Sequence, residues 1–459
     1  MIPSAISRDR FVLALLFLGL LAARLCHSGI VWVEEAYPTA AAIQILDGKS
    51  LYREVWFDKP PLSSLIYLLW DARIGVTLRI AGAAFVFACC WMLWRFGRDL
   101  WGPREGLAAA LLLGFFLTFG IPAAVMALAP DLLMMLPHIA AVYLAWRGRA
   151  FLSGLVAGVA LLINAKAFFV LAACLFFAWR GAGWLLAGFV IPNIVALIWF
   201  GRPYVDQVWR WGAMYSEQTF AFATGFVRTG NWAGFQSALV VGAAAALWKT
   251  DRWRWKMLAW LLLSLIGVAA GWRFFPRYYF QLLPVMALLA ARGYTLLWRC
   301  RFIMLALLLI PLVRFGPRYV ILANDLAHGR RSDWSDLALN QDSKAASDLI
   351  AHTGTLLVWG YRPDIFAYTR MPAGSRFLDS QPLTGVLADR HLTSSQPFAP
   401  ELALRNRREL IANDPTWIVD GLGPINPALA ITNFPDLREW LGNYRETGRT
   451  RFSIIYRLK

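Results

Sequence analysis

Long apolar runs separated by short polar segments occupy the first 315 residues. Each run is predicted to be a helix, although several are shorter than the roughly 20 residues that a transmembrane helix needs. The pattern therefore predicts a mainly α-helical, polytopic membrane bundle of about eleven spans. The runs lie at about 11–27, 75–94, 107–124, 131–146, 152–165, 167–179, 184–200, 233–248, 257–272, 279–298 and 302–315.

The pattern changes near residue 316. The first 315 residues are predicted to form the membrane domain, with a long polar loop at 28–74, and residues 316–459 a small α/β domain outside the membrane. In that domain, helices are expected at 332–352, 402–412 and 435–443, and strands at 355–361, 416–421 and 451–458. Residues 445–450, RETGRT, read as a turn. The short run 62–70 reads as an interfacial or re-entrant helix.

Composition agrees with the membrane class and sets the orientation. Of the 459 residues, 59% are hydrophobic, and the formal net charge of +17 comes largely from short loops such as 95–104, 147–149 and 249–256. Loops rich in lysine and arginine face the cytoplasm. The N-terminus is therefore predicted inside and the C-terminal domain outside, with 11–27 as an uncleaved span rather than a signal peptide. A nucleic-acid partner is not expected, because no basic face on a soluble domain is evident.

The cysteines and histidines do not suggest a metal centre. There are five of each, scattered along the chain without zinc-type spacing. No metal site is therefore predicted from them. A divalent cation held by carboxylates remains possible.

Unusual charges fall on the predicted outer side of the bundle. These residues lie in or beside the connections between apolar runs. Charged side chains are energetically costly beside a bilayer, so a group of them is a candidate functional site. Topology alone predicts that they form one pocket. The residues are Glu34, Glu35, Asp58, Lys59, Asp131, Lys166, Arg273 and Arg277. Simpler interpretations are an N-cap for Asp131, snorkelling for Lys166 and interfacial anchoring for Arg277.

Such a pocket has the parts for sugar transfer from a lipid phosphate. One carboxylate can take a proton from an acceptor, and cationic side chains can bind a phosphate as it leaves. Glu34 and Glu35 are adjacent, so on a helix they would point about 100° apart. We therefore expect one of them to face the acceptor and the other to cap, pair or bind a cation.

Several motifs resemble the GT-C membrane glycosyltransferases, the superfamily of protein O-mannosyltransferases and the lipid A aminoarabinose transferase. The matching segments are EEAYPTAAAIQILDGKSLYREVWFDKPP (34–61), APDLL (129–133), GLVAGVALLINAKAFFVL (154–171) and RFFPRYYFQLLP (273–284). In the tail, 358–385 resembles the outer domain of bacterial members. The resemblance covers most of the chain.

The resemblance implies roles for several of the site residues, and charge and position suggest the others. Glu34 takes the position of the family's catalytic aspartate and Glu35 that of its glutamate; the longer side chain at residue 34 is a departure. Lys59 matches a lysine that holds the donor phosphate, and Asp131 a second acid of the pocket. Arg277 or Tyr278 matches a late motif that faces the donor. Arg273 and Lys166 are assigned to phosphate binding, and Asp58 to the acceptor or the pocket.

The leading hypothesis is an inverting glycosyltransferase in the bacterial cytoplasmic (inner) membrane. It would move a hexose or pentose from a polyprenyl-phosphate donor to a lipid, glycan or protein acceptor on the outer side. The alternative is a polytopic transporter or lipid flippase without transferase activity. A glycan ligase or polymerase using the same donor is a third possibility.

Overall fold

The computed structural model describes residues 5–249, 251–297 and 301–459. It contains two compact units. The helical unit comprises Met1–Ser28, Lys59–Ser63 and Val76–Ser332, and the mixed unit comprises Gly29–Asp58, Ser64–Gly75 and Asp333–Lys459. The first polar loop, which the sequence analysis grouped with the membrane domain, thus lies largely in the same unit as the C-terminal segment.

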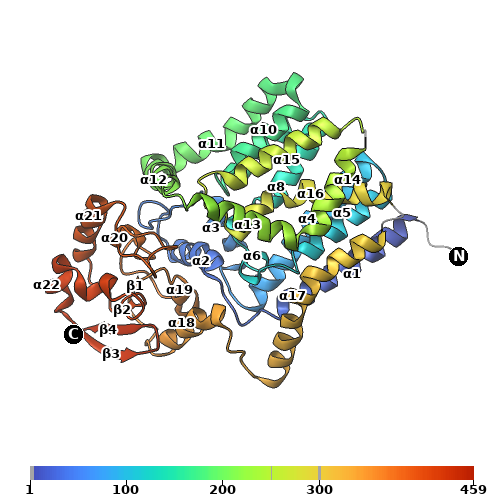
Figure 1. Ribbon diagram of the computed structural model, residues 1–459. Coiled ribbons are helices and arrows are strands. Elements are labelled where there is room, and N and C mark those ends of the chain that lie inside the picture. Colours follow the sequence, from blue (N-terminus) through green and yellow to red (C-terminus); the bar gives the residue numbers. More distant parts are fainter. Residues whose placement is uncertain (1–4, 250, 298–300) are drawn as a thin grey trace. The chain divides into compact units, whose positions relative to one another are not determined.

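The helical unit is built of α-helices joined by short connections (Figure 1). Helix α4 packs against α5, α8 and α1, and α16 packs against α5 and α14. The helices are α1 (Ala5–Leu25), α4 (Val76–Leu100), α5 (Pro103–Phe116), α6 (Pro122–Val125), α7 (Pro130–Leu133), α8 (Met135–Trp146), α9 (Ala150–Leu161), α10 (Ala167–Phe177), α11 (Ala182–Tyr204), α12 (Trp211–Glu217), α13 (Phe222–Phe235), α14 (Ser237–Trp248), α15 (Arg254–Ala269), α16 (Leu283–Leu296) and α17 (Arg301–His328). A 3₁₀ turn, η4 (Pro276–Gln281), precedes α16.

Three helical segments of the described chain are long and apolar enough to cross a bilayer: Val76–Leu100, Trp179–Glu217 and Phe302–His328. Other apolar helices, such as Ala150–Leu161 and Ala167–Phe177, are shorter. The predicted helical membrane class is therefore supported, while the count of about eleven spans stays a prediction. Helix α17 also continues beyond residue 315, where the sequence analysis divided the chain.

Small residues allow some of these helices to approach closely. On α9, Gly154 and Gly158 are four residues apart, and a Cβ at Gly154 would overlap the carbonyl oxygen of Leu185 on α11. A Cβ at Gly188 of α11 would likewise overlap the carbonyl oxygen of Phe151. This is the small-residue packing of membrane helices, in which backbones replace side chains at the contact.

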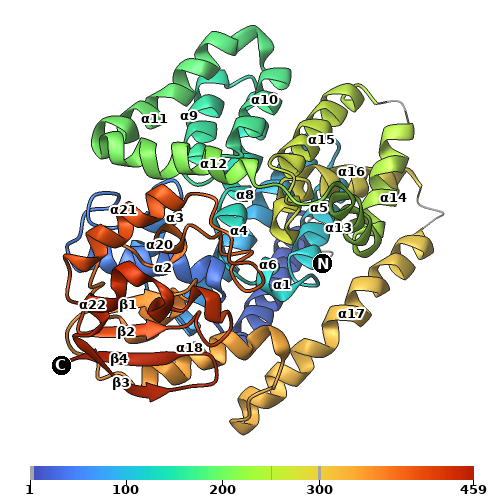
Figure 2. The ribbon, with the colours of Figure 1, turned by 60° about the vertical axis from the view of Figure 1, so that its left-hand side comes forward.

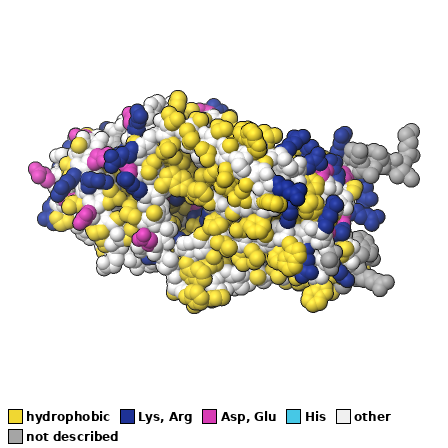
Figure 3. Space-filling model, turned by 90° about the horizontal axis from the view of Figure 1, so that it is seen from above, with side chains coloured by type: hydrophobic (Ala, Val, Ile, Leu, Met, Phe, Trp, Pro, Cys, Tyr) yellow, Lys and Arg dark blue, Asp and Glu magenta, His cyan; other side chains and the backbone are white. Residues whose placement is uncertain are grey.

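The loops rich in lysine and arginine meet at one end of the helical unit. Tyr143 near the end of α8 donates to Asp99 in the last turn of α4, and Trp101 donates to Asp251 before α15 (2.7 and 2.9 Å). Arg292, on the last turns of α16, pairs with Glu105 at 2.8 Å. Figure 3 shows one face on which hydrophobic side chains form a broad surface, with lysine and arginine at the right-hand end and, mixed with acidic side chains, at the left-hand end. We call the end of the helical unit that holds Arg98, Arg147 and Arg292 the cationic end; that it faces the cytoplasm stays a prediction.

The mixed unit contains a four-stranded sheet in the order β1-β2-β4-β3 (Figure 2). The strands are β1 (Leu356–Trp359), β2 (Trp417–Asp420), β3 (Tyr444–Arg449) and β4 (Ile454–Leu458), with β1 and β2 parallel and the other pairs antiparallel. The small C-terminal α/β structure was thus predicted correctly. The turn expected at 445–450 was wrong, because most of this polar segment is the edge strand β3, with a bulge between Glu446 and Gly448.

Helices of the mixed unit come from all three of its chain segments. From the C-terminal segment come α18 (Ala338–Asp348), α19 (Asp364–Thr369), α20 (Gln381–Thr384), α21 (Pro400–Ile411) and α22 (Arg438–Leu441). The run 62–70 is helical, as α3 (Leu62–Leu65) and the 3₁₀ helix η1 (Ile66–Trp70). From the first loop, α2 (Val33–Leu46) packs against α19. The Gln44 amide fixes this contact: it donates to Met371 O and accepts from Ala373 N (3.1 and 2.6 Å).

Candidate functional site

A buried carboxylate, Asp131, organises charges at the end of the helical unit opposite the cationic end. Its Oδ1 accepts hydrogen bonds from Lys166 Nζ at 3.3 Å and Asn164 Nδ2 at 3.2 Å, and its Oδ2 lies 3.4 Å from Arg277 Nε. Helices α8 and α16 begin beside this cluster and end at the cationic end. The two groups of charges therefore occupy opposite ends of the same helices.

Local structure explains why Asp131 and Lys166 face each other. Helix α7 begins at Pro130, after the N-cap Ala129, so Asp131 lies in its first turn without capping it. Lys166 is the N-cap residue of α10, and its backbone nitrogen bonds to the side chain of Asn164 at 3.0 Å. The N-cap interpretation of Asp131 is therefore wrong. So is snorkelling of Lys166, whose side chain is only 14% exposed.

Aromatic rings complete the cluster. Lys166 Nζ lies 2.7 Å from the ring centroid of Tyr278, and the Arg277 guanidinium lies 5.8 Å from the same ring. Gln281, one turn later, donates to the carbonyl oxygen of Lys166 at 3.0 Å. The motif 273–284 thus supplies a cation, a ring and an amide to one place.

Lys59 and Arg273 lie around Tyr215, in the connection that contains α12. The Arg273 guanidinium is 4.1 Å from the centroid of that ring, and Lys59 Nζ is 5.9 Å from it. Arg273 also donates to Gln218 O at 2.9 Å. Cations within about 6 Å of an aromatic face are stabilised by it. The structure therefore gathers Lys59, Lys166, Arg273 and Arg277, together with one anchoring carboxylate. We call these four the phosphate-site cations, after the role that the sequence analysis predicts for them.

Burial and like charge alter protonation in this group. Lys166 lies in the turn between α9 and α10; burial lowers its pKa to about 7, Asp131 opposes the shift, and Arg277 and Lys59 add to it. Burial raises the pKa of the Tyr278 hydroxyl, which stays protonated at neutral pH. Lys166 consequently titrates near neutrality, and an arriving anion would favour its charged form.

Two buried arginines hold the segment that leads to Asp131. Arg24 on α1 donates to Val125 O at 2.8 Å, and Arg79 on α4 donates to Met126 O at 2.9 Å. Both side chains are almost completely buried. They satisfy the carbonyls at the end of α6, where a helix terminus attracts cations.

The predicted acids of the first loop belong to the mixed unit. Glu35 is buried, and its Oε1 accepts the backbone N–H of Trp32 at 3.1 Å, which caps α2. Glu34, the preceding residue on α2, is only partly buried. Asp58 ends the mixed-unit segment, one residue before Lys59. Burial and the nearby Asp58 raise the pKa of Tyr37, whose ring stacks on Phe57 at 5.1 Å. The structure thus assigns a capping role to one glutamate of the pair.

Sequence reasoning missed several contributors to the cluster. Tyr215 and Asn164 lie in predicted outer connections, but neither is a charged residue, so the search for unusual charges passed over them. Gln281 was quoted within a motif without a role. Arg24 and Arg79 lie within predicted apolar runs, and a charged residue at such a position is the sequence signal that could have found them.

Within the described residues of the chain, no three His, Cys, Asp or Glu side chains lie together in a way that could hold a metal ion. Whether a divalent cation participates therefore stays a matter for experiment.

Comparisons with known proteins identify the fold. The chain is similar to ArnT from Cupriavidus metallidurans bound to undecaprenyl phosphate, with a TM-score of 0.59 at 13% identity over 96% of this chain and 97% of that one. The apo ArnT structure gives a TM-score of 0.60 at 13% identity over 99% and 98% of the two chains. The apo oligosaccharyltransferase of Archaeoglobus fulgidus gives 0.50 at 12% identity over 90% and 69%. No protein-family model and no curated protein sequence matches the chain. The predicted GT-C fold is confirmed.

Proposed function

We propose that this protein is an inverting glycosyltransferase that transfers a sugar from a polyprenyl-phosphate donor to an acceptor. The reaction would occur on the outer side of the bacterial cytoplasmic membrane. One observation carries the proposal: the four phosphate-site cations gather beside Asp131 at the end of an apolar helical unit opposite its cationic end. In a GT-C fold, such a group is suited to a lipid-linked phosphate.

The phosphate-site cations account for binding and departure of the donor phosphate. Lys166 and Arg277 are held in place by Asp131, so they require little rearrangement when the donor arrives. Preorganised cations stabilise negative charge as it develops on the bridging oxygen when the bond from sugar to phosphate breaks. The phosphate leaves as a stable anion, so this step does not depend on a general acid.

Glu34 is the proposed base. Glu35 caps α2, and Glu34 takes the position of the family's catalytic aspartate, so we assign to Glu34 the acceptance of the proton from the acceptor hydroxyl or amine. Attack from the face opposite the leaving phosphate would invert the anomeric centre. Asp58 and Tyr278 are proposed to shape the pocket around donor and acceptor.

The donor class rests on the fold and on charge. An ArnT neighbour binds undecaprenyl phosphate. In this chain the cations lie beside apolar helices, where a prenyl tail can stay in lipid while its phosphate reaches Lys59 and Lys166. The acceptor is proposed to be a lipid, a glycan or a protein. A divalent cation would be an addition to, not a substitute for, these side chains.

The test is donor turnover by the purified full-length protein in nanodiscs. Polyprenyl-phosphate hexoses and pentoses are supplied in turn with an extract of envelope lipids and glycans, and release of polyprenyl phosphate and transfer of labelled sugar are both measured. We expect one donor to be consumed, and Glu34→Gln and Lys59→Ala to abolish both signals. Glu439→Gln and Lys249→Ala, which change exposed residues of the same types, serve as controls and should keep them.

The outcome also separates enzyme from transporter. Turnover that survives replacement of both Glu34 and Glu35 would overturn the proposed mechanism. In a parallel reconstitution into vesicles, movement of a lipid-linked sugar across the membrane, without cleavage of any donor, would replace the transferase with a flippase. Repeating the assay with EDTA decides whether a divalent cation is needed.

A further inference from the structure

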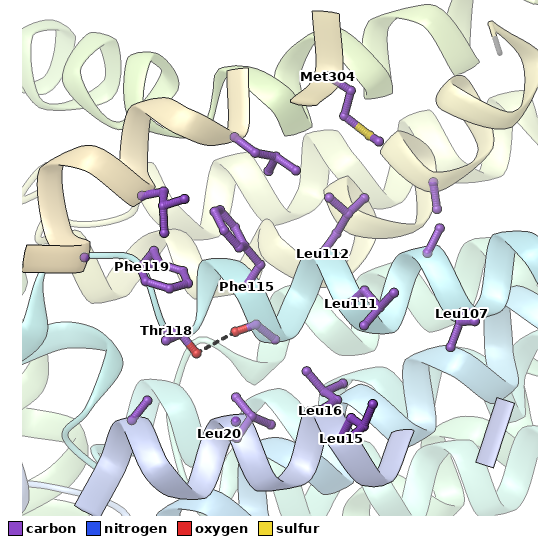
Figure 4. Close-up of a pocket in the computed structure, with 18 of the residues that line it drawn as sticks. Leu15, Leu16, Leu20, Leu107, Leu111, Leu112, Phe115, Thr118, Phe119 and Met304 are labelled. Atoms are coloured by element: carbon purple, nitrogen blue, oxygen red, sulfur yellow. Dashed lines mark hydrogen bonds between the residues drawn. The ribbon is translucent and has the colours of Figure 1, made fainter. Parts of the chain in front are cut away.

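A large apolar groove runs through the helical unit between α1, α5 and α17, with the end of α16 at one edge. Its volume is about 2660 Å³, well above the roughly 300–1,000 Å³ of sites for small molecules. In Figure 4, leucines of α1, such as Leu16 and Leu20, face α5, while Leu112 and Phe115 of α5 point toward α17. The groove therefore has the size and lining of a site for hydrocarbon chains.

The groove is also long and open to its surroundings. Its lining extends along α1 from Arg8 to Cys26, which is about 27 Å of helix and close to the roughly 30 Å hydrocarbon thickness of a bilayer. Leu15 and Leu111 in the lining are 51% and 39% exposed. Hydrocarbon chains can therefore enter sideways along the groove.

The two ends of the groove differ. At one end, Tyr319 of α17 donates to the carbonyl oxygen of Thr118 and packs against His27 at 5.3 Å, so α17 closes onto the bundle. The other end lies in the cationic end of the unit, where the lining includes Arg8, Asp9, Arg104 and Glu105. Polar groups thus lie at the ends of the groove, and apolar groups between them.

Charge at the cationic end specifies the headgroup. Asp9 already accepts the indole N–H of Trp94 at 3.4 Å, and Glu105 accepts Arg292 at 2.8 Å and Thr295 at 3.0 Å. Arg8 and Arg104, by contrast, are exposed and make no ion pair with any residue that the structure describes. Counting Arg292, three guanidinium groups at this end face two carboxylates, and this excess of positive charge complements an anion.

We propose that this groove binds an anionic phospholipid of the leaflet at the cationic end, with its phosphate on Arg8 and Arg104 and its acyl chains along α1, α5 and α17. Arginine binds phosphate through paired N–H donors, and basic residues at a membrane surface favour anionic lipids. This site is separate from the phosphate-site cations, which lie at the opposite end of the helices. The proposal of this phospholipid site does not depend on the transferase assignment.

The test is native mass spectrometry of the full-length protein, delipidated in detergent and titrated with phosphatidylglycerol or phosphatidylcholine of identical chains. We expect one phosphatidylglycerol to be retained in preference to phosphatidylcholine. Arg8→Gln and Arg104→Gln should each weaken that preference about fivefold, and the double variant about 25-fold. The matched control replaces Arg149 and Arg180, two exposed arginines outside the groove lining, by glutamine and should leave the preference unchanged.

A second variant tests the apolar part of the site. Leu111→Trp fills the groove and should reduce the number of retained lipids by one, whereas Leu186→Trp, on an exposed position of α11, should not. Equal retention of both lipids by the wild type, or a preference unaffected by the arginine double variant, would refute the site. A second copy of the chain or a retained polyprenyl phosphate in place of the phospholipid would also refute it.

Discussion

Replacing Asp131 with asparagine tests the idea that this carboxylate holds the phosphate-site cations together. The change keeps the shape of the side chain and the acceptor for Asn164, but removes the charge that pairs with Lys166 and Arg277. The cations would then repel one another at a site where the Asp131 side chain is 9% exposed. Loss of both stability and donor binding should follow.

The magnitude follows from burial. Removing one partner from a buried ion pair costs about 3–5 kcal/mol. Two features reduce this cost: the Arg277 side chain is 25% exposed, and Lys166, whose pKa is already about 7, can lose its proton. We therefore expect a loss of about 2–3 kcal/mol in the free energy of unfolding, or a fall of about 4–6 °C in Tm.

The assay is thermal unfolding in detergent, followed by tryptophan fluorescence. Asp206→Asn is a matched control, because Asp206 also pairs with two arginines, Arg202 and Arg210, but is 38% exposed. Its loss should cost less than about 1 kcal/mol. An Asp131→Asn protein that unfolds at the wild-type temperature would show that the carboxylate does not hold the cations, and the reasoning would fail.

Three further predictions follow from single positions. Gly154→Ala should destabilise the protein by about 1–3 kcal/mol, because its Cβ would overlap the Leu185 carbonyl oxygen. Gly183→Ala is the control and should not destabilise it, because Gly183 has open space around it. Equal Tm values for the two variants would contradict the close packing of α9 on α11. Glu34→Gln should lower kcat about 10²–10⁴-fold at unchanged Tm. Glu35→Gln keeps an oxygen that can cap α2, so its rate of sugar transfer should stay within a few-fold of the wild-type rate. If Glu35→Gln lowered kcat more than Glu34→Gln, Glu35 would be the base. Because the pKa of Lys166 is about 7, its charge is lost as pH rises through that value, so KM for the donor should increase above pH 7 while its phosphodiester stays anionic. Lys166→Arg, which stays charged, should remove this rise when KM is measured from pH 6 to 9.

The helical class could be predicted from the sequence because its signal is local. Apolar runs of helical length are visible one at a time, and most of them became helices at nearly the same residues. The edge strand β3 was missed because it lacks such a local signal. Its residues, such as Arg445 and Glu446, are mostly exposed, so no alternation of apolar and polar positions marks it.

Local sequence patterns could not predict which chain segments make up the mixed unit. Gln44 binds the backbone of Met371, 327 residues away, and the backbone nitrogen of Trp56 donates to Arg376 O at 2.7 Å. Both contacts join a polar loop to a polar domain. Hydrophobic periodicity places each segment outside the apolar runs but contains no information about which polar segments pair.

The candidate site could be predicted in part. Topology predicted that Asp131, Lys166 and Arg277 share one end of the bundle, because each lies in a connection on the same side. Topology did not distinguish a solvated charge from a paired one. That distinction depends on the local backbone at two positions. Pro130 begins α7, so that Asp131 is buried, and the turn at Asn164 brings Lys166 Nζ to within 3.3 Å of the Asp131 carboxylate.

The cost of this arrangement argues for its purpose. A lysine with a pKa near 7 is one that the fold has partly deprived of water, and Asp131 recovers only part of the loss. For stability alone, apolar residues of similar volume would do at least as well as a buried ion pair. An anion that arrives among Lys59, Lys166, Arg273 and Arg277 supplies the missing interaction, so binding energy is largest for a ligand with a compact negative charge. Under the proposed function, the donor phosphate completes the site, as expected when charges are preorganised for a phosphate rather than for folding.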